Sequence, residues 1–206
     1  MSKNGSEFDV LLKVVIVGDS GVGKTNYLCR FVDGKFCPVH EATVGFDFKS
    51  KILQLPTSKK RVKFQIWDTA GQEKYMALNR NLFQRVQGII LMYDITKPET
   101  YENLDKWMKL IKQLASGISL ILIGNKIDLI DERKVETEKG EQFATNNNLK
   151  LFESSAKSGV NVEESFVYLG EQMLLSNNLL DERSTKGSEY IISKETTYKK
   201  NKKKCC

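Results

Sequence analysis

The amino-acid sequence predicts an α/β fold, in which an open and mostly parallel β-sheet carries helices on both faces. The first supporting observation is that short aliphatic runs alternate with amphipathic stretches along the chain. The second is a pair of segments with alternating apolar and polar residues, which is typical of an antiparallel hairpin. Because ligands of open α/β sheets bind beyond the carboxyl ends of the strands, we expect the functional residues there.

The predicted elements follow from these patterns in chain order. Aliphatic runs typical of strands buried on both faces are residues 11–17, 89–93 and 120–123. Residues 46–55 and 61–67 predict the hairpin at a sheet edge, with residues 56–60 as its turn, and residues 150–152 predict a further strand. Helical periodicity predicts four helices between the strands, at residues 24–31, 100–114, 137–147 and 162–175.

Charge is spread unevenly along the 206 residues, which carry a formal net charge of +6. Residues 177–206 hold 8 Lys and Arg against 4 Asp and Glu, whereas residues 1–176 hold 24 against 22. The basic character therefore belongs largely to the end of the chain. Nucleic-acid binders usually carry their positive charge on a folded face, so we expect no nucleic-acid partner.

The composition also divides the chain into three predicted parts. Residues 1–8 form a flexible N-terminal arm, residues 9–176 the ligand-binding domain, and residues 177–206 a flexible basic tail. The N-terminus lacks the apolar core of a signal peptide, and no apolar run approaches the ~18 residues of a membrane-spanning helix. We therefore expect the protein to stay in the cytosol.

A glycine-rich motif between a predicted strand and a predicted helix has the pattern GxxxxGK[ST]. It reads Gly18-Asp19-Ser20-Gly21-Val22-Gly23-Lys24-Thr25 and is followed by Asn26. Such a loop turns successive backbone N–H groups, here those of residues 19–26, toward phosphate oxygens at a helix N-terminus. Lys24 would bridge the β- and γ-phosphates of a nucleotide, and the Thr25 hydroxyl would bind Mg²⁺. The alternative is an ordinary glycine-rich turn.

A second polar motif, Asp68-Thr69-Ala70-Gly71-Gln72, follows the second strand of the hairpin. The Asp68 carboxylate at a strand end can hold Mg²⁺ through a water molecule. Gly71 could bring its backbone N–H to a γ-phosphate, and Gln72 has the donor and the acceptor that orient an attacking water. The alternative is a polar loop after a strand.

A third motif, Asn125-Lys126-Ile127-Asp128, closes another predicted strand. The Asp128 carboxylate can accept hydrogen bonds from the N1–H and the exocyclic amine of guanine, whereas adenine would leave it unpaired. Such a buried polar pair can discriminate by ~10⁴ or more. Ser155-Ala156-Lys157 would add a backbone donor to the base and a lysine over it. The alternative for the tetrapeptide is a surface turn that Asp128 caps.

The order and spacing of these motifs, together with Thr43, resemble those of Ras-like small GTPases, and within them the chain resembles Rab proteins. Residues 44–48, 63–73 and 91–96 each resemble a Rab segment. The resemblance covers about residues 9–176 and the double-cysteine end. It implies a P-loop small-GTPase fold with a six-stranded sheet. It also implies a switch that binds GTP and GDP with Mg²⁺, hydrolyses GTP slowly without an activating protein and recruits effectors in vesicle transport.

The resemblance also assigns roles to single residues. Thr43 would place its hydroxyl on Mg²⁺ and its N–H on the γ-phosphate, and Gln72 with Lys24 would form the catalytic pair. Phe36 would pack against the guanine ring, although a core aromatic after a helix is the alternative. Where Rab proteins usually carry Tyr-Tyr-Arg-Gly-Ala, this chain has residues 82–86, Leu-Phe-Gln-Arg-Val, which makes partner choice at this place uncertain.

The end of the chain resembles the Rab double-cysteine end. Residues 199–204 contain five lysines and precede Cys205 and Cys206, which the resemblance implies are both geranylgeranylated. Two lipids with nearby lysines give stable anchoring to an anionic leaflet. The expected location is the cytosolic face of intracellular or plasma membranes, with a cytosolic pool. Expected partners are an exchange factor, an activating protein, a GDP-dissociation inhibitor, a prenylation escort and effectors.

Two other functions are compatible with parts of the pattern. A GTP-locked binding module would only recruit partners, although the intact Gln72 argues against it. A P-loop phosphotransferase would need an acceptor site with a lid, for which the chain has little spare length.

Overall fold

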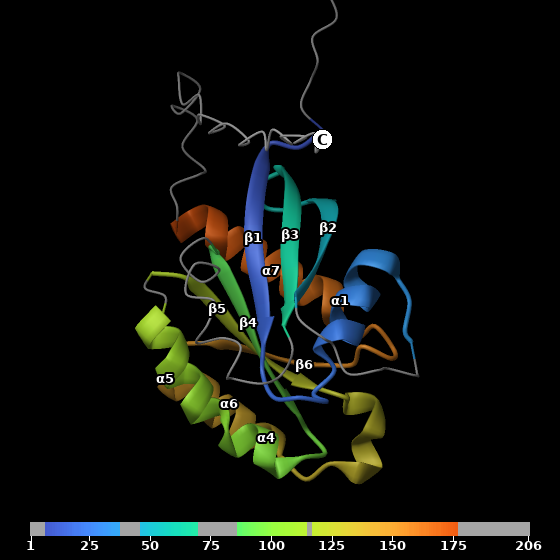
Figure 1. Cartoon of the computed structure of the whole chain (residues 1–206), viewed down its shortest axis with the longest axis vertical. Coiled ribbons are helices and arrows are strands. Elements are labelled where there is room, and N and C mark those ends of the chain that lie inside the picture. Colours follow the sequence, from blue (N-terminus) through green and yellow to red (C-terminus); the bar gives the residue numbers. More distant parts are fainter. Residues whose placement is uncertain (1–6, 38–45, 70–85, 115–116, 177–206) are drawn as a thin grey trace, which may run out of the picture.

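The computed structural model describes residues 7–37, 46–69, 86–114 and 117–176. These ranges contain a six-stranded sheet with the order β2-β3-β1-β4-β5-β6 (Figure 1). All neighbouring strands are parallel except the antiparallel pair β2–β3 at one edge, which confirms the predicted sheet and its edge hairpin. The strands are β1 (Val10–Val17), β2 (Phe46–Gln54), β3 (Arg61–Thr69), β4 (Gly88–Asp94), β5 (Ser119–Asn125) and β6 (Lys150–Ser154).

Helices cover both faces of this sheet. They are α1 (Lys24–Asp33), α4 (Pro98–Glu102), α5 (Leu104–Leu114), α6 (Thr137–Asn146) and α7 (Val162–Ser176), with a 3₁₀ helix η1 (Ile127–Glu132) after β5. Helices α1 and α7 pack on one face, and α5 and α6 pack on the other. None of the helices in the described ranges has both the length and the apolar character that crossing a membrane requires.

The prediction of a single helix over residues 100–114 is wrong, because the structure has two helices with Asn103 between them. Pro98 starts α4 at its first turn, two residues before the predicted beginning. The Asn103 amide group donates from Nδ2 to Asp19 Oδ2 at 2.7 Å, far away in the sequence. Asparagine is a weak helix former, so a tertiary bond of this kind readily fixes it at a helix boundary.

The core has two halves because side chains alternate along the central strands. Leu12, Val14 and Ile16 of β1 face the layer of α1 and α7, whereas Val15 and Val17 face α5 and α6. In the first half, Phe166 of α7 stacks on Phe31 of α1 with ring centroids 3.7 Å apart. Alternation of this kind, with both faces buried, is what parallel strands require.

The strand register brings the predicted site residues together at the carboxyl ends of the strands. Ile16 at the end of β1 lies opposite Asp68 of β3, and Asn125 at the end of β5 lies opposite Ser154 of β6. Because these strands are parallel, the loops that follow them leave the sheet at the same edge.

A close approach between α6 and β4 depends on a glycine. A Cβ atom at Gly140 of α6 would lie 2.4 Å from Tyr93 Oη and 3.1 Å from Leu151 Cδ2. A Cβ atom at Gly124 of β5 would lie 2.7 Å from the same hydroxyl. Tyr93 is fully buried, and its hydroxyl has no hydrogen-bond partner among the described residues. The ring is therefore held between two glycines with no space to move.

We expect Gly140→Ala to lower the free energy of unfolding by ~1–3 kcal/mol, because an added methyl group overpacks this contact. The loss should occur although alanine favours a helix interior by ~1 kcal/mol over glycine. In a Tyr93→Phe background, which lacks the hydroxyl, the cost should be much smaller. Urea unfolding of the wild type, both single variants and the double variant measures this. An equal cost in both backgrounds would show that another contact is responsible.

Candidate functional site

The loop between β1 and α1 has a conformation that only glycines permit. Gly18, Gly21 and Gly23 have φ angles of 140°, 79° and 99°. A Cβ atom at Gly18 would lie 2.2 Å from the Met92 carbonyl oxygen, and one at Gly23 would lie 2.5 Å from Asn125 Nδ2. The loop leads directly into α1, whose first backbone N–H groups and partial positive charge face the same place. This geometry suits a phosphate group.

Lys24 lies in the concave side of this loop. Its ammonium group donates to the carbonyl oxygens of Gly18 at 2.8 Å and Asp19 at 2.7 Å. The side chain is buried, and this burial lowers the pKa of Lys24 to about 8 against the opposing effect of the Asp68 and Asp19 carboxylates. A buried ammonium group with so little solvation gains strongly from a nearby anion. Lys24 is therefore placed and charged as a phosphate ligand should be.

Two oxygen ligands meet beside Lys24. The Thr25 hydroxyl donates to Asp68 Oδ2 at 2.5 Å, and Asp68 is almost fully buried at the end of β3. Hydroxyl and carboxylate oxygens are hard ligands of the kind that Mg²⁺ prefers. The described residues contain no cluster of three or more His, Cys, Asp or Glu side chains that could hold a metal ion. The remaining ligands of a Mg²⁺ ion here would come from phosphate, from water and from the predicted ligand Thr43, which lies outside the described residues.

Asn125 connects the phosphate loop to the loop that follows β6. Its buried amide donates from Nδ2 to the Val22 carbonyl oxygen at 2.8 Å. Its Oδ1 accepts from the backbone N–H of Ala156 at 3.1 Å. Both ends of the amide are therefore used to hold two loops at a fixed separation.

Asp128 is held by the same loop after β6. The Ser155 hydroxyl donates to Asp128 Oδ1 at 2.6 Å, and Lys157 Nζ lies 3.8 Å from Asp128 Oδ2. These two contacts orient the carboxylate. A fixed carboxylate of this kind can accept a pair of neighbouring N–H donors from a ligand.

Lys126 links the same motif to the phosphate loop and to β4. Its ammonium group donates to the Gly21 carbonyl oxygen at 2.9 Å and pairs with Asp94 Oδ2 at 2.6 Å. The Asp94 side chain has no exposed surface. The third motif is therefore bound to the first by Asn125 and Lys126 together.

The structure brings most predicted residues together and leaves others aside. The Asn26 side chain accepts from the Cys37 backbone N–H at 3.0 Å, after the end of α1. Phe36 is half-buried and packs against the core half that contains α1. Its contact with the guanine ring stays a prediction. Five predicted residues lie outside the described ranges, so their places are not given: Thr43, Gly71, Gln72, Cys205 and Cys206.

Asn103, Trp107 and Arg30 also support the site, although the sequence did not indicate them. Asp19 Oδ1 accepts from Trp107 Nε1 at 2.7 Å, and Asp19 Oδ2 accepts from Asn103 Nδ2 at 2.7 Å. Arg30 of α1 donates from Nε to the Ala156 carbonyl oxygen at 2.8 Å and from Nη2 to the Lys157 carbonyl oxygen at 2.6 Å.

These contacts join residues 84 to 127 positions apart, so no local pattern marks them. The one available signal was Trp107, because an indole on an apolar helix face usually finds an acceptor for its N–H when buried.

We expect Asp19 and Trp107 to be energetically coupled by ~1–3 kcal/mol, because each good hydrogen bond to a charged group stabilises by about that much. The free energies of unfolding of Asp19→Ala, Trp107→Phe and the double variant measure this coupling. Asp131→Ala is the matched control, since Asp131 is exposed on η1. It should be additive with Trp107→Phe to within ~0.5 kcal/mol. If the effects of Asp19→Ala and Trp107→Phe on the free energy of unfolding were additive, Trp107 would not anchor Asp19.

Comparison with known proteins agrees with the geometry of this site. Residues 13–175 match the family model of the Ras family. The chain is 40% identical over 200 residues to the Ras-related protein Rab-13 of Rattus norvegicus, covering 96% of this chain and 97% of the relative. It is 43% identical to Rab-15 of Homo sapiens, covering 82% and 79%. It is 42% identical to Rab-10 of Diplobatis ommata, covering 81% and 83%. The chain therefore belongs to the Ras family of small GTPases, among the Rab proteins.

Proposed function

We propose that this Rab-type small GTPase binds GTP and GDP with Mg²⁺ at the edge where β1, β3, β5 and β6 end, and hydrolyses GTP there. The observation that carries the proposal is the buried Asn125 amide, which bonds the phosphate loop at Val22 and the loop at Ala156. One side chain thereby fixes a phosphate site and a base site at a constant distance. As a Rab protein, the molecule acts in vesicle transport by alternating between its two nucleotide states.

The phosphate half of the proposed site consists of the loop backbone and three side chains. The backbone N–H groups of residues 19–26 and the Lys24 ammonium group bind the β- and γ-phosphates. Thr25 would hold Mg²⁺ directly, and Asp68 would hold it through water. When bound, this ion neutralises charge that develops on the phosphate oxygens. Thr43 and Gly71 are proposed to contact the γ-phosphate from the two switch segments.

The base half of the proposed site recognises guanine through Asp128. Its carboxylate accepts from the guanine N1–H and exocyclic amine, and the Ser155 hydroxyl fixes its orientation at 2.6 Å. The Ala156 backbone contributes to the base site, and the stems of Lys126 and Lys157 cover the base. Phe36 remains the predicted aromatic neighbour of the base.

Hydrolysis is proposed to depend on Gln72, which orients the attacking water. The residues 18–25 and 69–73 contain no arginine. The developing charge of the transition state is therefore only partly compensated within the chain, and unaided turnover should be slow. An activating protein that supplies an arginine would raise the rate by ~10³–10⁵.

Partners that distinguish the two nucleotide states would contact the surface between the switch segments. Phe48 on the edge strand β2 is 56% exposed, and its ring lies 6.4 Å from that of Trp67 on β3. An exposed aromatic ring beside a half-buried tryptophan is typical of protein-binding surfaces. We propose that effectors bind here. The departure at residues 82–86 supports a choice of partners different from that of other Rab proteins.

Membrane attachment is proposed for the end of the chain. Geranylgeranyl groups on Cys205 and Cys206, together with the lysines of residues 199–204, would hold the protein on the cytosolic face of a membrane. A GDP-dissociation inhibitor and a prenylation escort would bind the same tail and maintain a cytosolic pool. An exchange factor and an activating protein would drive the nucleotide cycle.

The nucleotide that copurifies with the protein tests the proposed function most directly. The full chain is expressed without added ligand and denatured, and the released nucleotide is separated on a column. Near-stoichiometric GDP is the expected result, since the site is built for guanine and hydrolysis completes during purification. Near-stoichiometric GTP would instead indicate the GTP-locked module. An adenine nucleotide would favour the phosphotransferase, and an empty site would contradict the proposal.

We expect Gln72→Leu to slow single-turnover GTP hydrolysis by at least ~10-fold while leaving GTP affinity within about threefold, because leucine cannot orient water. Phosphate release after addition of Mg²⁺ measures the rate, and competition against labelled GDP measures the affinity. Gln87→Leu is the matched control, since Gln87 directly precedes β4, at the end of the strand away from the proposed site. Its Oε1 accepts from the Lys13 backbone N–H. Unchanged hydrolysis in Gln72→Leu would contradict the assigned role.

We expect the variant with both Cys205→Ser and Cys206→Ser to lose membrane attachment in cells, whereas either single substitution leaves marginal and reversible attachment. Fractionation of cells into membranes and cytosol measures this. The copurifying nucleotide should be the same in all three variants, because the lipids lie outside the nucleotide site. Full membrane attachment of the double variant would show that the anchor is elsewhere.

A further inference from the structure

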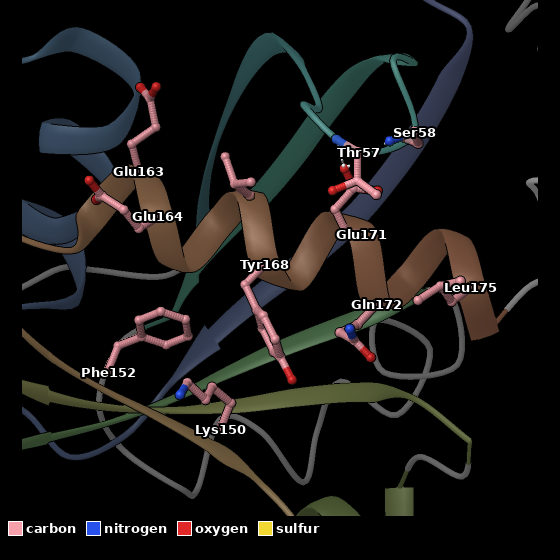
Figure 2. A pocket seen from close by; sticks show the side chains of 11 residues that line it. Thr57, Ser58, Lys150, Phe152, Glu163, Glu164, Tyr168, Glu171, Gln172 and Leu175 are labelled. Atoms are coloured by element: carbon pink, nitrogen blue, oxygen red, sulfur yellow. Dashed lines mark hydrogen bonds between the residues drawn. The ribbon is translucent and has the colours of Figure 1, made fainter.

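A groove runs along the outer side of α7, away from the nucleotide site. It has a volume of about 780 Å³ and lies between α7, the β2–β3 turn and the edge strand β6. We name it the α7 groove. Figure 2 shows the rings of Phe152 and Tyr168 inside it, and these rings lie 5.6 Å apart in an edge-to-face arrangement. Leu175, which is 55% exposed, closes the end of the groove next to the last residue of α7.

One wall of the α7 groove is fixed at both ends. Glu171 of α7 accepts from the backbone N–H groups of Thr57 at 2.8 Å and Ser58 at 3.1 Å, as the dashed lines of Figure 2 show. Near the start of α7, Glu163 pairs with Lys51 of β2 at 3.1 Å. The hairpin is thus held against α7, and the groove keeps its shape.

The lining carries negative charge at the end where α7 begins. Glu163 and Glu164 are both exposed there, and Lys150 lies on the opposite side, on β6. A ligand that suits this surface has apolar side chains for the middle of the groove and positive charge at the end near Glu163. A segment of this chain has that composition.

We propose that residues 190–194 of the chain's own tail, Tyr-Ile-Ile-Ser-Lys, dock in the α7 groove. Tyr190, Ile191 and Ile192 form the longest apolar run after residue 180. Lys194 follows them and supplies the positive charge of the segment, whereas Glu195 and the lysines of residues 199–204 lie beyond it. The apolar run binds beside Tyr168 and Phe152. Lys194 lies toward Glu163 and Glu164, so the segment runs antiparallel to α7.

The length of the tail permits this arrangement. The groove extends along α7 from Leu175 to Glu164, which is ~17 Å at 1.5 Å per helical residue. Five extended residues span ~17 Å as well. Residues 177–189 connect the end of α7 to the docking segment and reach up to ~43 Å when extended, which is ample for a reversal of direction. Because the ligand is tethered, its effective concentration is high, so weak contacts suffice.

Docking would change the distance between the folded domain and the lipids. With residues 190–194 bound, only residues 195–204 separate the groove from the two C-terminal cysteines. This consequence rests on the proposed lipid anchor, whereas the docking itself does not. Docking also places Ile191 and Ile192 where a prenylation escort could not bind them at the same time.

Methyl NMR of the full-length, unlipidated, GDP-loaded protein tests the docking. We expect the Ile191 and Ile192 methyl signals to show ring-current shifts and nuclear Overhauser contacts to the Tyr168 ring. Both Leu175→Lys and Glu164→Lys change exposed groove residues, so the fold should persist. Leu175→Lys should lower the docked-to-free ratio by about 10-fold or more, since it removes apolar contact area and adds repulsive charge. Glu164→Lys should also lower the docked-to-free ratio, because it replaces a negative charge by a positive charge at the end of the groove that faces Lys194.

Glu138→Lys is the matched control, because Glu138 is exposed on α6, on the other face of the sheet, and should leave the tail signals unchanged. Random-coil positions of both methyl signals in the wild type would overturn the proposal. Ile191 and Ile192 methyl signals that stay unchanged in both Leu175→Lys and Glu164→Lys would also overturn the proposal. Contacts that disappear on dilution would assign the groove to a second copy of the chain and would equally overturn it. The bound nucleotide, measured on the same samples, reports separately on the proposed function.

Discussion

The position of one buried amide determines the arrangement of the nucleotide site. Asn125 ends the strand β5, and its side chain bonds the loop after β1 on one side and the loop after β6 on the other. Both bonds are made without water, so removal of the amide would leave a buried carbonyl oxygen and a buried N–H group unsatisfied. The parallel sheet brings the three strand ends together, and this amide then fixes the separation of their loops.

Charged side chains also shape the loop between β1 and α1. Lys24 is buried against backbone carbonyl oxygens, and this burial lowers the pKa of its ammonium group, so a bound anion would stabilise its charge. Asp19 in turn is held by Trp107 and Asn103, so the carbonyl oxygen that contacts Lys24 belongs to a residue anchored by α5.

The two surfaces outside this site differ in the way they are built. The aromatic pair Phe48 and Trp67 lies on the edge hairpin. The α7 groove lies on the far side of the same hairpin, where Glu171 holds the β2–β3 turn against α7. The hairpin thus forms part of the proposed partner surface and part of the α7 groove, and its antiparallel strand pair connects the two.

The sequence alone determined the sheet with its edge hairpin, most helix positions, the phosphate loop and the guanine motif. These features depend on local patterns: apolar periodicity, glycines that need positive φ, and motifs at strand ends. The tertiary structure decided the break at Asn103, the anchoring of Asp19 by Trp107, the support of Ala156 by Arg30 and the packing of Phe36 against the core. Each of these depends on contacts between distant segments, and a side chain that can bond in several ways chooses its partner only when the fold brings one within reach.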